Sequence, residues 1–299
     1  MKEVRPAKPA AHRFCILANP ASGSQPRNQR YALLKRAAAI LGAEVHGLDT
    51  ASADQFAQCA RERAERWENL VVAGGDGTFS LVLNAVDLPA VTLAFLPFGT
   101  GNALTHALSY RGGIESISAR IAAGHSHSCD LIDCDGRRKA FMVSLGLDGC
   151  AIELYEAYKR RGYRGLNAHL RAGLRAAFKE FRPTGGKIVV DGEARRVKKL
   201  HSLMVVKQPY FGMGLKVVPG ARWGDGYLHS RAISSGLAGI SGGLLTGFTI
   251  GNRAGEYRRG KQLTALLDAP LPLQVDGEVG WTSDRFTFRS LPGILRMRY

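Results

Sequence analysis

The sequence predicts an N-terminal α/β domain built on a doubly wound parallel sheet, followed by a second domain made mostly of strands. In the first half, short apolar runs alternate with stretches of helical periodicity, a pattern typical of a parallel sheet with crossover helices. From about residue 128 onward, apolar runs separated by turn residues follow one another, and helical stretches become scarce. A chain of 299 residues is long enough for two domains. We therefore expect a division into residues 1–127 and 128–299.

Four strands are expected in the first half, each leading through a loop to a helix. The expected strands are residues 13–18, 45–48, 70–73 and 91–96, and the expected helices are residues 30–41, 53–67 and 79–86, with one more after residue 102. Glycine-containing loops follow the first, third and fourth strands. Ligands of doubly wound sheets bind at the carboxyl ends of the strands, so we expect the binding site at these loops.

The loop after the third strand carries the strongest local signal. Gly74, Gly75 and Gly77 surround Asp76, and Thr78 is expected to be the N-cap of the following helix. Glycines that lead from a strand into a helix N-terminus expose backbone N–H groups to an anion. A carboxylate beside a phosphate is repelled unless a cation lies between them, which favours a metal-bound nucleotide. The alternative is a tight strand-to-helix connection in which Asp76 caps the helix.

The charge is uneven along the chain. The formal net charge is +16, of which residues 1–130 carry +2 and the remainder carries +14. This basic second half implies an anionic partner, either nucleic acid, an acidic membrane or a phosphate substrate. Patterns of known nucleic-acid modules are missing from the sequence, so an anionic membrane surface is favoured over nucleic acid.

Five scattered cysteines form no CxxC pair, and we expect them to be reduced, in a cytoplasmic protein without a zinc site. Residues 1–12 are basic and contain proline but no apolar core, so they are expected to form a loose tail rather than a secretion signal.

Two common nucleotide-binding motifs are not matched. No GxGxxG follows a strand, and the P-loop-like residues 255–261 lack the hydroxyl residue after the lysine.

Three motifs in order carry a family resemblance. They are Asn19-Pro20-x-Ser22-Gly23, Gly74-Gly75-Asp76-Gly77-Thr78 and Pro97-x-Gly99-Thr100-Gly101-Asn102-Ala103-Leu104. This series resembles the diacylglycerol kinase catalytic-domain family, which includes bacterial lipid kinases and the sphingosine and ceramide kinases. The resemblance implies a C-terminal β-sandwich domain, with the last residues, 293–299, returning to the first domain. Asn102-Ala103 and Ser80-Leu81 depart from the common Asn-Asp and Asn-Glu, and these departures leave the lipid substrate open.

The resemblance implies an ATP-dependent kinase that uses Mg²⁺ and phosphorylates a diacylglycerol-like or sphingosine-like lipid hydroxyl. The implied nucleotide-binding residues are Asn19, Ser22, Gly23, Thr50, Gly74, Gly75, Asp76, Gly77, Thr78 and Thr100. Asp76 would act on the metal-phosphate cluster, directly or through water. Asp-Gly-Glu occurs twice, at residues 191–193 and 276–278, and both copies are expected to form hairpin turns. The second copy matches the family's C-terminal motif, so Glu278 is the implied general base.

A turn in the second half resembles the family's structural Mg²⁺ site. Residues 219–228 match the pattern Pro-x-Ala…Asp-Gly-x-Leu. By position, the ligands would be the carboxylate of Asp225 and the carbonyl groups of Arg222 and Tyr227, and hard oxygen ligands of this kind suit Mg²⁺. The alternative is a type I turn between two strands.

Residues 152–181 are expected to form one helical insert. Leu166, Leu170, Leu174 and Phe178 recur every four residues, and each of the last three is followed by a basic residue. The insert either faces a membrane or phosphates, or is simply a solvated basic helix. The resemblance to the sphingosine kinase branch implies that arginines in this region bind nucleotide phosphates, and Arg160, Arg161 and Arg164 are the candidates. Residues 232–252 carry no charge but are rich in Gly, Ser and Thr, so we expect a packed helix and a loop there rather than a membrane span.

Two other functions stay open. An NAD kinase-like enzyme shares the Gly-Gly-Asp-Gly-Thr motif and the two-domain plan, although the other two motifs do not support it. A lipid- or nucleotide-binding regulator that has lost catalysis is suggested by Ser80-Leu81. We expect a peripheral membrane enzyme, and the sequence does not define its oligomeric state.

Overall fold

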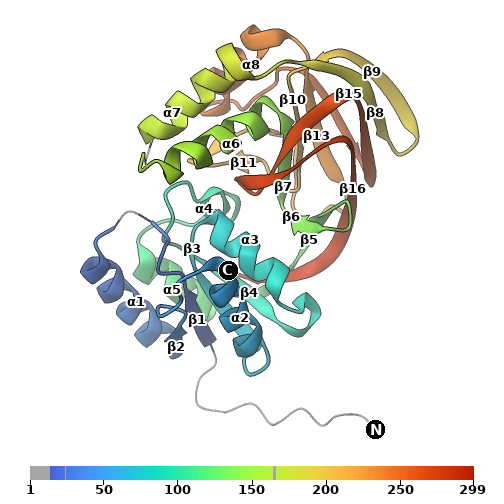
Figure 1. Ribbon diagram of the computed structural model, residues 1–299. Coiled ribbons are helices and arrows are strands. Elements are labelled where there is room, and N and C mark those ends of the chain that lie inside the picture. The colour runs from blue at the N-terminus through green and yellow to red at the C-terminus, as the bar shows by residue number, and fades with distance from the viewer. Residues whose placement is uncertain (1–13, 24, 164–165) are drawn as a thin grey trace. The chain divides into compact units, whose positions relative to one another are not determined.

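A computed structural model describes residues 14–23, 25–163 and 166–299, and it divides the chain into two compact units (Figure 1). The first unit runs to Cys129 and takes in Ile294–Tyr299, and the second unit is Asp130–Gly293. The chain therefore passes between the units twice, after Cys129 and after Gly293. The sequence placed this division after residue 127. Residues 1–12, expected to form a loose tail, lie outside the described residues.

A parallel sheet forms the centre of the first unit, in the order β2–β1–β3–β4. Its strands are β1 (Phe14–Ala18), β2 (Ala43–His46), β3 (Asn69–Gly74) and β4 (Thr92–Pro97). The last strand of the chain, β16 (Glu278–Arg298), returns beside β4, with Met297 opposite Leu93 in parallel register. Strands β1, β3 and β4 are buried because their apolar runs are covered on both faces, whereas the edge strand β2 is only partly buried. This arrangement confirms the predicted doubly wound α/β domain.

The described residues of the first unit form five helices around this sheet. They are α1 (Arg27–Leu41), α2 (Ala53–Ala64), α3 (Asp76–Ala85), α4 (Ala103–Ala107) and α5 (Ile114–Ala123). A 3-10 turn, η1 (Leu88–Ala90), precedes β4. Helices α1 and α5 pack together, and α2 and α3 pack together on the opposite face of the sheet (Figure 1). Each loop at the carboxyl end of β1, β3 and β4 therefore leads into the helix layer beside it.

The start of α3 differs from the prediction. The N-cap is Gly75, in an extended conformation, and the helix begins at Asp76. Thr78 lies inside the first turn, where its hydroxyl bonds to Asn19 and Ser22 instead of capping the helix. The prediction was wrong because these tertiary partners, about 60 residues away in sequence, occupy the hydroxyl group that would have formed the cap.

The second unit is an antiparallel, β-sandwich-like domain. Its main path runs β14–β13–β10–β7–β15–β16, with β8 and β9 attached to β15 and with β5 and β6 attached to β16. Strands not yet given are β5 (Ser126–Cys134), β6 (Arg138–Ala140), β7 (Met142–Gly146), β8 (Thr184–Val190), β9 (Glu193–Leu200), β10 (Ser202–Val206), β11 (Tyr210–Phe211), β12 (Leu215–Lys216), β13 (Leu228–Ile233), β14 (Glu256–Gly260) and β15 (Gln262–Val275). Inward-facing apolar side chains, among them Val143, Leu145, Phe286 and Phe288, form one core.

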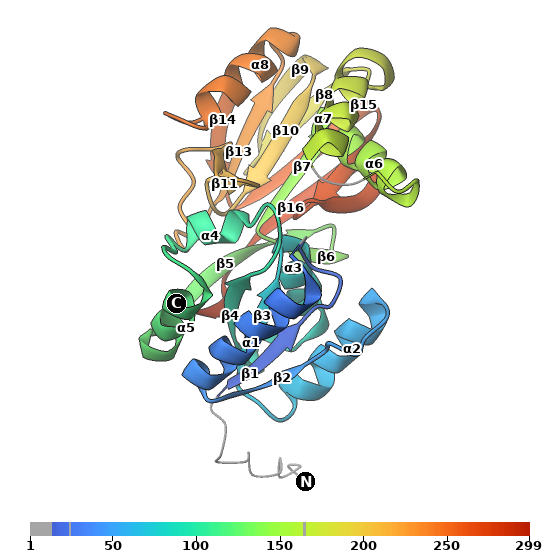
Figure 2. The same cartoon turned by 90° about the vertical axis from the view of Figure 1, so that its left-hand side faces the viewer.

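The insert between β7 and β8 is two helices rather than one. Helix α6 (Leu147–Arg160) begins directly after Gly146, which has φ +93°, and α7 (Leu166–Arg175) continues into a π-helical turn, η2 (Ala176–Glu180). Helices α6 and α7 lie side by side in both views (Figures 1 and 2). The continuous helical periodicity of the sequence concealed the break between the two helices, near Gly162, whose φ is +89°.

Both Asp-Gly-Glu copies form two-residue hairpin turns, as predicted. Asp191 and Gly192 have φ +48° and +88°, and Asp276 and Gly277 have φ +51° and +84°. Positive φ at both central residues defines the type I′ turn, which Asp-Gly favours. The flanking residues pair as Val190 with Glu193 in one hairpin and as Val275 with Glu278 in the other.

The uncharged stretch at residues 232–252 contains α8 (Gly236–Gly247). In the part of the chain that the structure describes, neither α8 nor any other helix has the length and apolar character needed to span a membrane. The five cysteines, all within the described residues, form no disulfide.

Candidate active site

The loops after β1 and β3 are joined through one hydroxyl group. The side-chain amide of Asn19 donates to Oγ1 of Thr78 at 2.9 Å, and Oγ of Ser22 lies 2.8 Å from the same atom. Asn19 Oδ1 in turn accepts from the N–H of Ala21 at 2.9 Å, which fixes the loop's own turn. Ser22 and Thr78 are buried. The structure thus brings together two of the three motifs on which the sequence analysis relied.

Close backbone packing joins the third loop to the other two. A Cβ atom on Gly99 would collide with the Cα atom of Gly75, and one on Gly23 would collide with the carbonyl oxygen of Phe98. Gly23 also has φ +77°, where a side chain is strained. The carbonyl of Gly74 accepts from the N–H groups of Phe98 and Gly99. The glycines are therefore required by the approach of three loops to one another at the N-terminus of α3.

The carboxylate of Asp76 caps a helix, but not its own helix. Oδ2 accepts from the N–H of Ala103 at 2.8 Å and Oδ1 from the N–H of Leu104 at 3.1 Å, so the carboxylate binds the N-terminus of α4. Burial raises the pKa of Asp76 above its ordinary value of 3.8, and these two hydrogen bonds oppose that shift. Each carboxylate oxygen can accept more than one hydrogen bond, so capping α4 leaves capacity toward a metal or a water molecule.

The remaining nucleotide-site candidates lie on the same edge of the sheet. Oγ1 of Thr50 donates to the carbonyl of Gly47 at 2.7 Å and holds the turn after β2. Gly77 lies in the first turn of α3, and Thr100 is exposed in the bend after Gly99. Asn102, in left-handed conformation, donates to the carbonyl of Gly99, while its buried Oδ1 has no hydrogen-bond partner among the described residues.

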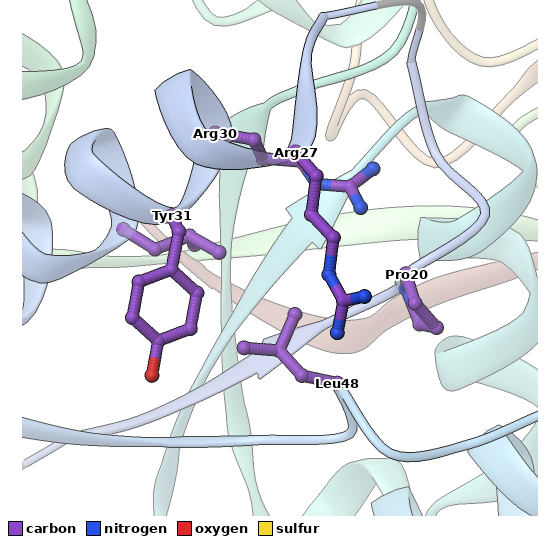
Figure 3. A pocket seen from close by; sticks show the side chains of 6 residues that line it. Pro20, Arg27, Arg30, Tyr31 and Leu48 are labelled. Atoms are coloured by element: carbon purple, nitrogen blue, oxygen red, sulfur yellow. The ribbon is translucent and has the colours of Figure 1, made fainter.

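A cavity of about 320 Å³ lies beside the loop after β1. It is lined by Pro20, Arg27, Arg30, Tyr31, Leu34 and Leu48. Arg27 extends between Pro20 and Leu48, and the ring of Tyr31 stands beside Leu48 (Figure 3). Arg30 donates to the carbonyl of Ser22 at 2.7 Å. Sequence reasoning missed both arginines, although two cations in the first turn after the Asn19–Gly23 loop were a usable signal.

In the second unit, Glu278 stands directly after a type I′ turn. Its carboxylate accepts from Nη2 of Arg138 at 2.7 Å. It lines a cavity of about 540 Å³ together with Val279 and four residues of α6: Glu153, Glu156, Lys159 and Arg160. Of the three arginines suggested for phosphates, Arg160 therefore lies at the cavity of Glu278, Arg161 is exposed, and Arg164 lies outside the described residues. No motif pointed to Arg138.

Two of the three proposed ligands of a structural metal, the carboxylate of Asp225 and the carbonyl of Tyr227, have other partners. The carboxylate of Asp225 accepts from the N–H of Tyr227 at 3.0 Å and lies 3.1 Å from Nε2 of His229. The carbonyl of Tyr227 accepts from Nζ of the fully buried Lys207 at 2.8 Å, and the N–H of Arg222 points to Nε2 of His229. The positive charge of the Lys207 ammonium lies against one of the three oxygen atoms and would repel a second cation there, so the donor set does not fit a divalent ion. In the described ranges, no group of three or more His, Cys, Asp or Glu side chains could hold a metal.

Two family models match most of the chain. Residues 13–134 match the family model of the diacylglycerol kinase catalytic domain, and residues 141–298 match that of the YegS C-terminal NAD kinase beta sandwich-like domain. These two domains define a two-domain phosphotransferase. The chain belongs to the diacylglycerol kinase catalytic-domain family of lipid kinases.

The chain is similar over most of its length to curated and solved members. It is 28% identical over 275 residues to a diacylglycerol kinase of Staphylococcus carnosus, covering 89% of this chain and 88% of that protein. It is 25% identical over 281 residues to a diacylglycerol kinase of Staphylococcus saprophyticus, with the same coverage. A diacylglycerol kinase structure from Bacillus anthracis superimposes with a TM-score of 0.71 at 18% identity, covering 98% of each chain. Another Bacillus anthracis structure gives a TM-score of 0.79 at 19% identity, with 98% coverage of each chain.

Proposed function

We propose that the protein transfers the γ-phosphoryl group of Mg-ATP to the hydroxyl group of a diacylglycerol-like or sphingosine-like lipid. The observation that carries this proposal is the meeting of the three glycine loops at the N-terminus of α3. The first N–H groups of a helix have no partner within the helix, and its dipole favours negative charge, so this edge suits phosphates. The names of the Staphylococcus relatives support diacylglycerol as the first lipid to test.

On the nucleotide side, the hydroxyl of Thr78 fixes the loop after β1 over α3. The close packing of Gly75 on Gly99 leaves backbone, rather than side chains, at the surface that phosphates would approach. Arg27 and Arg30 add positive charge at the adjoining cavity. Asp76, anchored on α4, is the carboxylate that would bind the Mg²⁺ of Mg-ATP, directly or through water. The metal ion would neutralise the phosphates during transfer.

On the lipid side, we assign the general base to Glu278. A carboxylate within hydrogen-bond reach of an alcohol takes its proton as the oxygen attacks phosphorus. The bond to Arg138 fixes the orientation of Glu278, and the cavity beside α6 leaves it accessible. The proton would move from the lipid hydroxyl to a Glu278 oxygen atom while the new O–P bond forms and the bond to ADP breaks.

Helix α7 supports a peripheral association of this cytoplasmic enzyme with anionic membranes. In α7 and the turn η2 that continues it, the small residues Ala168, Ala172 and Ala176 are buried, whereas large apolar side chains are exposed. Leu170, Leu174 and Phe178 are 56%, 59% and 68% exposed. Each is followed by a basic residue: Arg171, Arg175 and Lys179. An exposed apolar face flanked by basic residues is typical of helices that lie at the surface of an anionic membrane.

One observation favours a second acceptor. The second unit matches a domain described as NAD kinase beta sandwich-like, so NAD is the alternative alcohol substrate. The acceptor is tested with γ-³²P-ATP, Mg²⁺ and vesicles that contain diacylglycerol, sphingosine or ceramide, with NAD in a parallel reaction. We expect label in a lipid and none in NAD. Label in NAD alone would contradict the lipid assignment, and a folded protein that labels no acceptor would indicate a non-catalytic binding protein.

A further inference from the structure

A buried lysine stands at the turn that resembles a metal site. The side chain of Lys207 is 0% exposed. Its Nζ donates to Oδ2 of Asp130 at 3.2 Å, to the carbonyl of Tyr227 at 2.8 Å and to Oγ of Ser290 at 2.6 Å. An ammonium group has three protons and here has three acceptors, so its hydrogen-bonding capacity is filled. A buried charge is tolerated when it is paired and fully bonded in this way.

This lysine bonds to a carboxylate that connects the first and last residues of the second unit. Asp130 is the first residue of the second unit and Gly293 is its last. Oδ1 of Asp130 accepts from the N–H of Gly293 at 2.9 Å, and Oδ2 accepts from the N–H of Gly226 at 2.7 Å. The carboxylate of Asp130 therefore joins the two crossing strands, β5 and β16, to the turn at residues 219–227, and Lys207 neutralises it.

A divalent ion at the same turn would compete with this ammonium. Mg²⁺ bound to the carbonyl of Tyr227 at about 2.1 Å would lie within about 5 Å of Nζ of Lys207. Two cations at that separation repel each other strongly in a buried site. The carboxylate of Asp225 meanwhile bonds to the backbone of Tyr227 and lies against His229. Two of the three groups that would bind the metal, the carboxylate of Asp225 and the carbonyl of Tyr227, therefore already have a partner within the protein.

We propose that the Lys207 ammonium is the structural cation of this turn, and that the second unit holds the turn and the two chain crossings without a bound divalent ion. Lys207 is thus a positioning residue for the first and last residues of the second unit and for the turn at residues 219–227. This inference does not rest on the proposed kinase activity, because it concerns the nucleotide-free protein.

Ion dependence of stability in the nucleotide-free protein tests this inference. Melting curves are recorded in EDTA and in Mg²⁺, and Mn²⁺ binding is followed by electron paramagnetic resonance, for the wild type, Asp225→Asn and Lys207→Gln. We expect the wild type and Asp225→Asn to show no ion dependence of Tm and the same Mn²⁺ spectra. Lys207→Gln removes the charge but can still donate hydrogen bonds, and we expect its Tm to fall by about 6 °C or more, because it leaves Asp130 buried and unpaired.

Two results would overturn the inference. One is a Tm of the wild type that rises with Mg²⁺, or a spectrum of bound Mn²⁺ in the wild type, when Asp225→Asn abolishes that effect. The other is a Lys207→Gln protein that melts like the wild type. If Lys207→Gln does not fold, the comparison of wild type with Asp225→Asn still decides between an ammonium and a divalent ion.

Discussion

Single hydroxyl and carboxylate groups hold the candidate nucleotide site together. The hydroxyl of Thr78 is shared by Asn19 and Ser22, and the carboxylate of Asp76 joins the loop after β3 to the helix after β4. Both side chains therefore position backbone segments as well as facing the proposed ligand. When a residue of this pair is substituted, stability reports its role in positioning the backbone, whereas binding and turnover report its role toward the ligand.

Thr78→Val keeps the shape of the side chain and removes both hydrogen bonds. We expect the KM for ATP to rise about three- to tenfold, because the loop after β1 is no longer fixed over α3 and a hydrogen bond contributes about 0.5–1.5 kcal/mol. Ser118→Ala is the matched control, since it removes a buried hydroxyl that bonds only within α5, to Ile114. Steady-state kinetics on both folded proteins checks this. An unchanged KM in Thr78→Val would show that the hydrogen bonds of the Thr78 hydroxyl have no part in nucleotide binding.

Asp76→Asn should remain folded and lose most turnover. One amide oxygen can still cap α4, so we expect a loss of stability of about 1–2 kcal/mol, from one hydrogen bond to a backbone N–H. Activity should fall far more, because the amide cannot bind the metal of Mg-ATP as a carboxylate does. Circular dichroism and ATP turnover on the same preparation check this. Turnover near that of the wild type would remove Asp76 from the reaction.

The raised pKa of Asp76 also predicts a pH dependence with a definite sign. Because burial raises the folded-state pKa, the folded protein binds this proton more tightly than the unfolded chain does. Protonation of Asp76 therefore adds stability as the pH falls from the folded pKa toward 3.8, while the same protonation removes activity. We expect the acid limb of kcat/KM to have its midpoint above 3.8. A midpoint at or below that value would contradict the geometry of a buried, weakly solvated carboxylate.

At the scale of elements, local patterns predicted the strands and both hairpins well. Three buried apolar runs became β1, β3 and β4, a weaker pattern became the edge strand β2, and two Asp-Gly pairs became type I′ turns. The failures lie where distant residues decide the outcome. Thr78 does not cap α3 because Asn19 and Ser22 occupy its hydroxyl. The helical insert divides into two helices because α7 packs against α6 and its alanines are buried. The periodicity of one helix cannot predict such packing between helices.

The exposed face of α7 gives a prediction for membrane binding. Leu174→Asp should reduce co-sedimentation with anionic vesicles about tenfold or more, because burying a leucine contributes about 1.5–3 kcal/mol. Leu245→Asp is the control, since Leu245 is 78% exposed on a different helix, α8. Binding of the wild type should weaken with salt, since the Debye length is about 10 Å at 0.1 M. Equal binding of all three proteins, or equal binding to neutral vesicles, would exclude α7 as the docking face.

At the scale of the whole molecule, the sequence predicted the motifs of the candidate site but not their partners. The three glycine loops were expected at one edge of the sheet, and the structure brings them together there. Arg138 is 140 residues from Glu278, and Lys207 is 77 residues from Asp130, so no local pattern connects them. The Asp225 turn illustrates the reverse problem. Its motif matches a metal site, yet Nζ of Lys207, the residue after β10, donates to the carbonyl oxygen of Tyr227 that would bind the metal.

The two Asp-Gly-Glu hairpins offer an internal control for the proposed reaction. Glu278 and Glu193 both follow a type I′ turn, and each carboxylate pairs with an arginine, Arg138 at 2.7 Å and Arg258 at 3.3 Å. The effects of their amide variants on stability should therefore be similar. Only Glu278 lines the cavity beside α6 and matches the position of the implied base.

The most direct test is the rate of ³²P transfer from ATP to lipid by wild type, Glu278→Gln and Glu193→Gln, with matched melting curves. Loss of a general base lowers the rate by about a hundred- to ten-thousandfold, so we predict that loss in kcat for Glu278→Gln, with little change in the KM for ATP. Glu193→Gln should change kcat by less than about twofold, as a surface substitution does. Equal losses in the two variants, or full activity in Glu278→Gln, would contradict the assignment of Glu278 as the base of a lipid kinase.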